Sequence, residues 1–185
     1  MSVKKFSIGL FVFGLACIAC GYCLSSFDNF KSELLIENLL FNSGLNVVLL
    51  SFGYVSLVVG VIFMIFKKLT DNCTLSSLGL ATATSLFAGM GLYCLLIILL
   101  EAGFSDRSEH PVSSLVCGIG GIISIIAVIA LFFVYFFIYR EKYPSRKGVV
   151  VDLIFGILYI IPFFLASAVF YDIVEMVVRY FIPNF

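Results

Sequence analysis

Charged side chains are scarce in this chain, and their scarcity excludes a soluble fold. Only 12% of the 185 residues are Asp, Glu, Lys or Arg, which is too few to coat a water-soluble globule of this size. Hydrophobic residues make up 62% of the chain and the mean hydropathy is +1.18, whereas soluble domains are roughly 45–50% apolar. The formal net charge is zero, so bulk electrostatics predicts no nucleic-acid partner.

Catalytic motifs and buried ionisable residues are also missing. The sequence contains no P-loop, GxSxG, HExxH or dinucleotide-binding fingerprint. Intramembrane ionisable residues are the usual markers of transport, but Asp152 and Glu101 lie at the ends of their apolar runs and neither reaches the midplane. The sequence therefore argues against a proton-coupled pump. We expect a protein that is not an enzyme and that needs no cofactor.

Five long apolar runs are what the chain does have. They cover residues 6–24, 45–66, 79–100, 115–139 and 149–171, with 19 to 25 residues each, and a bilayer core of about 30 Å needs about 20 residues of helix. The connecting segments are short, so we predict one all-α transmembrane domain over 1–185, built as a bundle of five helices. The first run is expected to stay uncleaved, because neither Cys17 nor Cys20 has the aliphatic residue three positions earlier that a lipoprotein signal needs.

The basic residues are distributed unevenly between the two ends of the predicted spans. With the N-terminus placed in the cytoplasm, eight lie inside and three outside, and short loops are where the positive-inside rule is most reliable. We therefore predict a cytoplasmic N-terminus and an outside C-terminus, in a plasma or inner membrane, with an organelle membrane left open. The inside residues are Lys4, Lys5, Lys67, Lys68, Arg140, Lys142, Arg146 and Lys147, and the outside residues are Lys31, Arg107 and Arg179.

Two segments outside the spans have amphipathic patterns. Residues 28–42 alternate leucines and phenylalanines with acidic residues at helical spacing, which predicts a helix in the outer interface. Residues 172–182 continue the last span with a polar face, so we expect a helix that protrudes outside or bends along the interface. Pro162 should kink the last span because it removes a backbone hydrogen bond.

Small residues recur on the first, third and fourth spans at the spacing that lets helix backbones approach closely. Pairs such as Ala16/Cys20 and Cys17/Gly21 are four residues apart. The third span carries small residues at four-residue intervals, which predicts a central helix, whereas the end of the fourth span should face lipid, with Tyr135 as an interface anchor. The predicted packing residues are Gly14, Cys17, Gly21, Ala81, Ser85, Gly89 and Gly121.

These features favour a non-catalytic subunit, assembly factor or regulator that works inside a larger membrane complex. Its expected partners are membrane lipid and either other membrane-protein subunits or further copies of the chain. The alternative is a thiol redox or metal-centre protein, because five of the six cysteines fall in the outer half of the membrane. That alternative requires at least three of Cys17, Cys20, Cys94 and Cys117 to converge.

Two further alternatives stay open. A small transporter or channel component predicts a polar cavity near Ser51, Thr84, Ser85 or Ser124. A membrane enzyme acting on lipid would need polar groups gathered over a groove, and the candidates are Glu101, Asp106, Glu109 and His110. The single histidine could also bind a metal or sense pH, although a solvated loop is the commoner setting for such a group.

Overall fold

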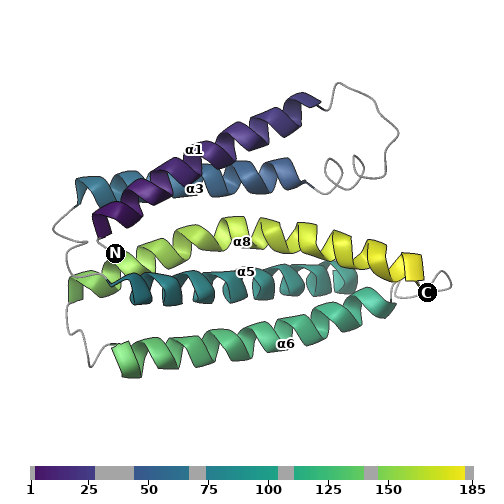
Figure 1. Cartoon of the computed structure of the whole chain (residues 1–185). Coiled ribbons are helices and arrows are strands. Elements are labelled where there is room, and N and C mark those ends of the chain that lie inside the picture. The colour runs from purple at the N-terminus through teal and green to yellow at the C-terminus, as the bar shows by residue number, and fades with distance from the viewer. Residues whose placement is uncertain (1–2, 28–43, 67–73, 104–110, 140–145, 182–185) are drawn as a thin grey trace.

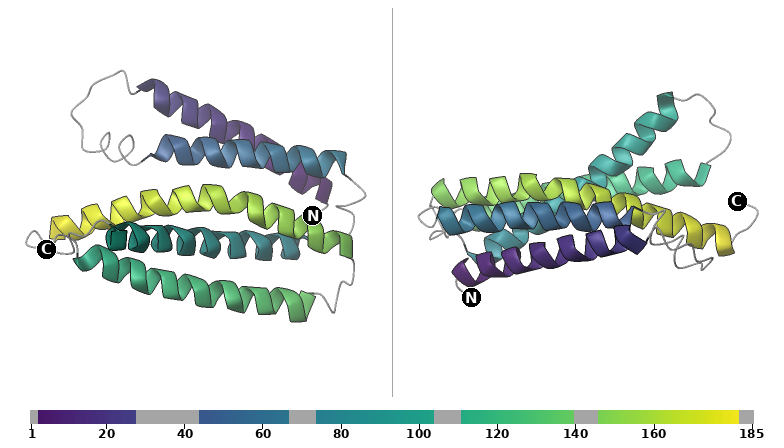
Figure 2. Two further views of the ribbon diagram at one scale, coloured as in Figure 1. Left: turned by 180° about the vertical axis from the view of Figure 1, so that it is seen from behind. Right: turned by 90° about the horizontal axis from the view of Figure 1, so that it is seen from above.

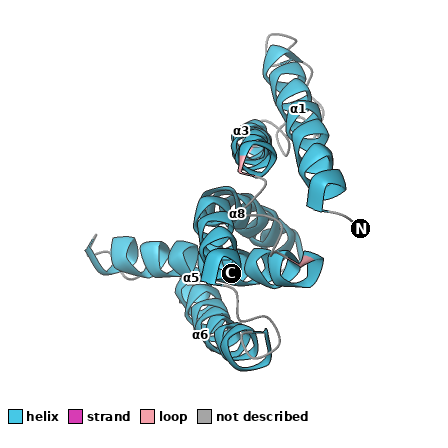
Figure 3. Ribbon diagram, turned by 90° about the vertical axis from the view of Figure 1, so that its left-hand side faces the viewer, coloured by secondary structure: helices cyan, strands magenta, loops and turns pink. Residues whose placement is uncertain are grey.

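The computed structural model describes residues 3–27, 44–66, 74–103, 111–139 and 146–181. Nearly all of these residues are helical, and the described part of the chain contains no strand (Figure 3). The helices are α1 (Val3–Phe27), α3 (Leu45–Ile65), α5 (Leu75–Gly103), α6 (Pro111–Phe133) with its π-helical continuation η1 (Val134–Tyr139), and α8 (Arg146–Phe181).

Five helices are long and apolar enough to cross a membrane, as the hydropathy of the sequence predicts. The candidate spans are Lys4–Ser26, Leu45–Ile65, Leu75–Leu100, Cys117–Phe137 and Gly148–Val177. The chain is thus an all-helical, multi-pass membrane protein. The predicted amphipathic helix at 28–42 lies outside the described residues.

The five helices form a row in which the order differs from the order in the sequence. α1 packs against α3, α3 against α8, α8 against α5, and α5 against α6 (Figure 1). Seen from above, α1, α3 and α8 run side by side (Figure 2). The view onto the helix ends shows the row from α1 at one edge to α6 at the other (Figure 3). The last helix therefore joins two hairpins, α1–α3 and α5–α6.

The prediction that the third span is the central helix is wrong in this respect. α5 does lie between α8 and α6, but α8 occupies the middle of the row. Only 11% of the α5 span is buried within the chain, compared with 28% of the α8 span and 33% of the α3 span. Small residues of α5 lie at its contacts with both α8 and α6, and much of the remaining surface of the helix stays exposed.

The core lies where α8 meets α3 and α5. Val59 and Phe63 of α3 pack with Phe155 and Tyr159 of α8, and the rings of Phe63 and Phe155 stack with centroids 6.0 Å apart. Leu78 of α5, which is 1% exposed, closes the same cluster from the other side. The cluster therefore holds the two hairpins together through the last helix.

Local signals explain where α5 begins and how α8 continues. α5 starts at Leu75, four residues before the predicted boundary, because the Thr74 hydroxyl accepts a hydrogen bond from the Ser77 amide at 3.2 Å and caps the helix. α8 continues unbroken through Pro162 to Phe181 and is bowed along its length (Figure 1). The helix therefore includes nearly all of the predicted extension at 172–182.

Candidate functional site

Three buried serines tie neighbouring helices together. Ser7 of α1 donates to the Gly60 carbonyl of α3 at 2.9 Å. The hydroxyls of Ser56 on α3 and Tyr159 on α8 hydrogen-bond at 2.8 Å. Ser85 of α5 lies 2.8 Å from the Gly156 carbonyl of α8 and 2.7 Å from the Ala81 carbonyl of its own helix. In an apolar solvent such hydroxyls contribute to helix association because they find no water.

The α1–α3 crossing is the closest approach of two backbones in the first hairpin. A Cβ atom built on Gly14 would lie 2.8 Å from the Gly53 carbonyl oxygen and 2.9 Å from the Leu57 nitrogen. One on Gly21 would lie 2.8 Å from the Leu50 side chain. The crossing therefore requires glycine at positions 14 and 53, which are buried on both helices.

Gly89 has the same role at the α5–α8 crossing. A Cβ there would lie 2.7 Å from the Phe164 nitrogen and 2.9 Å from the Phe163 carbonyl carbon. Ala81 and Ser85, two turns and one turn earlier on α5, are buried on the same side at 8% and 1% exposure. At the α5–α6 contact the fit is looser, since a Cβ on Gly121 would meet Cys94 at an ordinary 3.4 Å.

Ser7, Ser56 and Tyr159 are contact residues that the sequence reasoning missed. Ser56 lies on the face of α3 that also carries Gly53 and Gly60, at spacings of three and four residues. That spacing of small residues is the sequence signal from which Ser56 could have been predicted as a contact residue. Nothing comparable marks Tyr159, whose neighbours on α8 are bulky and apolar.

One buried acid lies at the end of the bundle where α5 and α8 begin. Asp152 of α8 is 5% exposed. Its carboxylate accepts a hydrogen bond from the Tyr135 hydroxyl of η1 at 3.0 Å and lies 3.3 Å from the Ser77 hydroxyl in the first turn of α5. The positive end of the α5 dipole also favours a carboxylate at this place.

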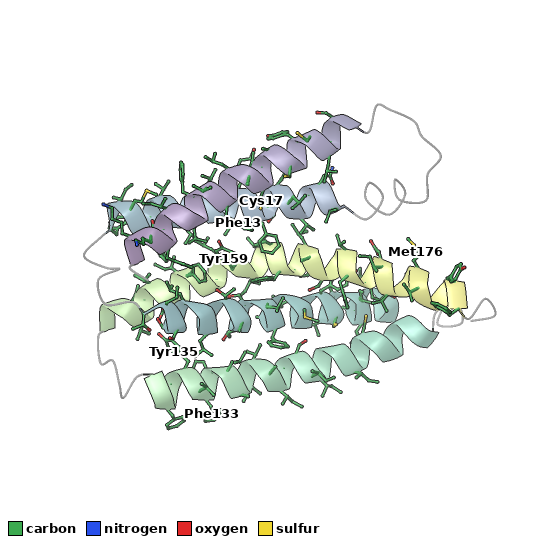
Figure 4. The ribbon with its side chains drawn as sticks, viewed as in Figure 1. Phe13, Cys17, Phe133, Tyr135, Tyr159 and Met176 are labelled. Carbon is green, nitrogen blue, oxygen red and sulfur yellow. The ribbon has the colours of Figure 1, made fainter. Side chains whose placement is uncertain are left out.

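This cluster of Asp152, Tyr135 and Ser77 changes the interpretation of Tyr135. The sequence predicts a tyrosine that anchors the helix in the lipid interface. In the structure the Tyr135 side chain is half-buried, and it extends from η1 to Asp152 of α8. Phe133, two residues earlier, points away from the bundle (Figure 4). The π-helical turn at η1 is a type of irregularity that is common at functional sites, and here it carries the residue that binds the buried acid.

The cysteines divide into three settings. Cys17 is buried on α1 at 7% exposure, whereas Cys20 and Cys23 on the same helix are exposed. Cys94 of α5 and Cys117 of α6 meet across the helix contact, and their thiols hydrogen-bond. No three His, Cys, Asp or Glu side chains within the described ranges gather as metal ligands would. The convergence of three cysteines that was predicted for the thiol redox or metal-centre alternative is therefore not found there.

The polar residues of the transporter alternative lie in separate environments. The Thr84 hydroxyl donates to the Leu80 carbonyl of its own helix at 2.8 Å, and the Ser85 hydroxyl lies between the carbonyls of Ala81 and Gly156. Ser124 on α6 is 1% exposed, and its hydroxyl has no hydrogen-bond partner within the described structure. The candidates of the enzyme alternative, Glu101, Asp106, Glu109 and His110, lie outside the described side chains.

α1 carries a second face of small residues that the chain itself does not cover. Ala16, Cys20 and Cys23 are exposed, and a Cβ on Gly9 would meet nothing within 4 Å. At 100° per residue the four positions fall within about 60° of the helix circumference. Their direction differs from that of Gly14, Cys17 and Gly21, which face α3.

The fold and these contacts define a class, that of small multi-pass helical membrane proteins whose helices pack through glycines and buried hydroxyls. No protein-family model matches the chain, and no curated protein or solved structure is recognisably similar to it.

Proposed function

We propose that the chain is a non-catalytic subunit, assembly factor or regulator of a larger membrane complex, and that α1 contacts the partner. The observation that carries the proposal is the exposed small-residue face of α1, formed by Gly9, Ala16, Cys20 and Cys23. Small residues at such spacing let a second helix approach closely, and this approach is a main source of helix association in lipid.

The position of α1 in the row supports this proposal. α1 is an edge helix that packs along α3, and near its N-terminal end Phe6 reaches Phe155 of α8. The opposite edge of the row is different. The outward side of α6 carries Ile122, Ile126 and Ile129, each more than half exposed, and bulky aliphatic side chains of this kind suit a lipid-facing surface.

Two exposed tyrosines link α1 to α3 at the level of Cys23, on a side of α1 about 100° away from that residue. The hydroxyls of Tyr22 on α1 and Tyr54 on α3 hydrogen-bond at 2.8 Å, although both side chains are about half exposed. Two phenols that share one hydrogen bond retain one further donor. A polar group of a partner helix is a suitable acceptor for that donor.

The orientation belongs to the same proposal. A cytoplasmic N-terminus and an outside C-terminus place the eight inside basic residues on one side of the membrane. The α1 face then runs from the inner leaflet at Gly9 to the outer leaflet at Cys23. The location in a plasma or inner membrane and the interfacial helix at 28–42 are proposed on the same sequence patterns.

A matched pair of substitutions tests the proposal. Ala16→Leu fills the exposed small-residue face, and Ala130→Leu makes the same change at an exposed position of α6. After mild-detergent extraction, we expect Ala16→Leu to lose at least tenfold of the co-purifying subunit, or of the homo-oligomer, relative to Ala130→Leu. Equal recovery from the two variants, or a monomer from the unaltered chain, would contradict the proposal.

A further inference from the structure

The contact between Cys94 and Cys117 differs from the other cysteine positions. The two thiols come from different helices, α5 and α6, and they hydrogen-bond to each other. Neither cysteine is in a disulfide in this structure. Cys117 is 1% exposed and Cys94 is half-buried, so the pair lies in the helix contact with one sulfur nearer the surface.

The α6 backbone comes close to Cys94 beside Cys117. A Cβ on Gly120 would lie 3.4 Å from the Cys94 sulfur, and a Cβ on Gly121 would lie 3.4 Å from the Cys94 Cβ atom. A disulfide requires Cβ atoms about 3.5 to 4.5 Å apart. The two glycines let Cys94 approach the α6 backbone about one turn from Cys117, whose thiol it contacts.

Aromatic side chains support the α5 side of the pair. Tyr93, next to Cys94, packs edge-on against Phe164 with ring centroids 5.6 Å apart, and its centroid lies 6.0 Å from that of Tyr171. Both partners belong to α8. This segment of α5 is thus held from the side opposite α6, which keeps Cys94 directed at the contact.

We propose that Cys94 and Cys117 form a redox site that closes into a disulfide between α5 and α6. In the oxidation two S–H bonds break and one S–S bond forms. The two electrons and two protons pass to a two-electron acceptor, which is either a quinone that becomes a quinol or a disulfide that becomes two thiols. The site does not depend on the proposed partner of α1, since it lies at the other hairpin.

The arrangement of cysteines along the chain gives a direct assay. Cys117 is the last of the six cysteines, and the other five precede residue 95. A specific protease site inserted in the segment 104–110 divides the chain so that the C-terminal part carries Cys117 alone. The two parts then stay together in a non-reducing gel only when Cys117 has formed a disulfide within the chain.

The experiment treats membrane vesicles holding the full chain with one of two oxidants before cleavage. One arm receives a short-chain ubiquinone, which partitions into lipid, and the other receives oxidised glutathione, which stays in water. We expect at least one arm to link most of the chain, dithiothreitol to separate the parts again, and Cys94→Ser to lower the linked fraction at least tenfold. Cys73→Ser, at the cysteine between the second and third spans, should link as the unaltered chain does.

Peptide mass spectrometry of the oxidised, unaltered chain gives a second readout that does not depend on the folding of any variant. It should identify a peptide pair joined through Cys94 and Cys117. The arm that links the chain identifies the acceptor as lipid-borne or water-borne. The proposal is overturned if neither oxidant links the parts, or if the linked peptide carries Cys117 joined to a cysteine other than Cys94.

Discussion

Between α1 and α3, glycine faces glycine, and the backbones come so close that a methyl group at position 14 would overlap a carbonyl oxygen of the other helix. Between α5 and α6 the same type of residue, Gly121, leaves ordinary van der Waals room. That contact holds two thiols and a serine whose hydroxyl has no hydrogen-bond partner in the part of the chain that the structure describes. Both pairs are hairpins with similar small-residue patterns. The comparison shows that small residues permit close approach, but that the side chains opposite them decide whether it happens.

The two hairpins also differ in how their polar groups are used. In the first, the Ser7 hydroxyl is bonded to the Gly60 carbonyl across the helices. In the second, the Ser124 hydroxyl is equally buried and has no partner among the described residues. We infer that the α1–α3 contact is a fixed structural element. The α5–α6 contact instead contains reactive groups, the thiols of Cys94 and Cys117, that packing of the helices does not require.

The largest expected difference between the hairpins appears when one methyl group is added to a glycine of each. Gly14→Ala must push apart two backbones, so we expect a loss of about 1 to 3 kcal/mol in the free energy of unfolding. Gly121→Ala has room for the methyl group and should not destabilise the chain. Reversible unfolding in mixed detergent micelles, followed by circular dichroism, measures both.

Gly9→Ala is the control for this pair because it lies on α1 in open space. It isolates the helix-propensity gain of alanine over glycine, which is up to about 1 kcal/mol. If Gly14→Ala were as stable as Gly9→Ala, the close crossing of α1 and α3 would be refuted.

A smaller effect is expected where α8 attaches to the second hairpin. Asp152→Ala removes the acceptor of the Tyr135 hydroxyl and leaves a buried donor unsatisfied, which should cost about 1 to 2 kcal/mol. Asp152→Asn keeps an acceptor oxygen and should lose less. The same unfolding measurement separates the two variants, and equal losses would show that hydrogen bonding to Tyr135 does not matter.

The smallest expected effect concerns the two serines. Ser7→Ala removes an interhelical hydrogen bond, and such bonds contribute about 0.6 kcal/mol on average in membrane helices. Ser124→Ala removes a hydroxyl that makes no bond, so stability should stay the same or rise slightly. Equal losses in the free energy of unfolding for Ser7→Ala and Ser124→Ala would contradict the proposed difference in hydrogen bonding between the two hairpins.

Hydropathy predicts the five spans because length and apolar content suffice to identify a membrane helix. The exact start of α5 is less visible, since Ser76 and Ser77 look like loop residues until the Thr74 cap is recognised. The lateral order of the five helices was not predictable from the sequence. Nothing in the pattern of α8 shows that Tyr159 meets Ser56 on one side while Gly156 meets Ser85 on the other, because such pairings depend on the three-dimensional registration of helices.

The small-residue rule located the packing glycines without identifying their partners. Gly14, Gly21 and Gly89 lie at close crossings. The spacing alone, however, does not distinguish the pair Ala16/Cys20 from the pair Cys17/Gly21. The structure separates them, since the second pair faces α3 and the first is exposed. Likewise the outer-half cysteines were visible, but the contact of Cys94 with Cys117, and not with Cys17, follows from which helices become neighbours.

The central claim is that the exposed face of α1 contacts another protein while the outer face of α6 contacts lipid. A photo-crosslinking amino acid at position 16, and in a separate sample at position 130, tests it in intact membranes of the native host. The account predicts a protein adduct of defined mass from position 16 and only lipid adducts from position 130. Lipid adducts alone from position 16 would contradict it.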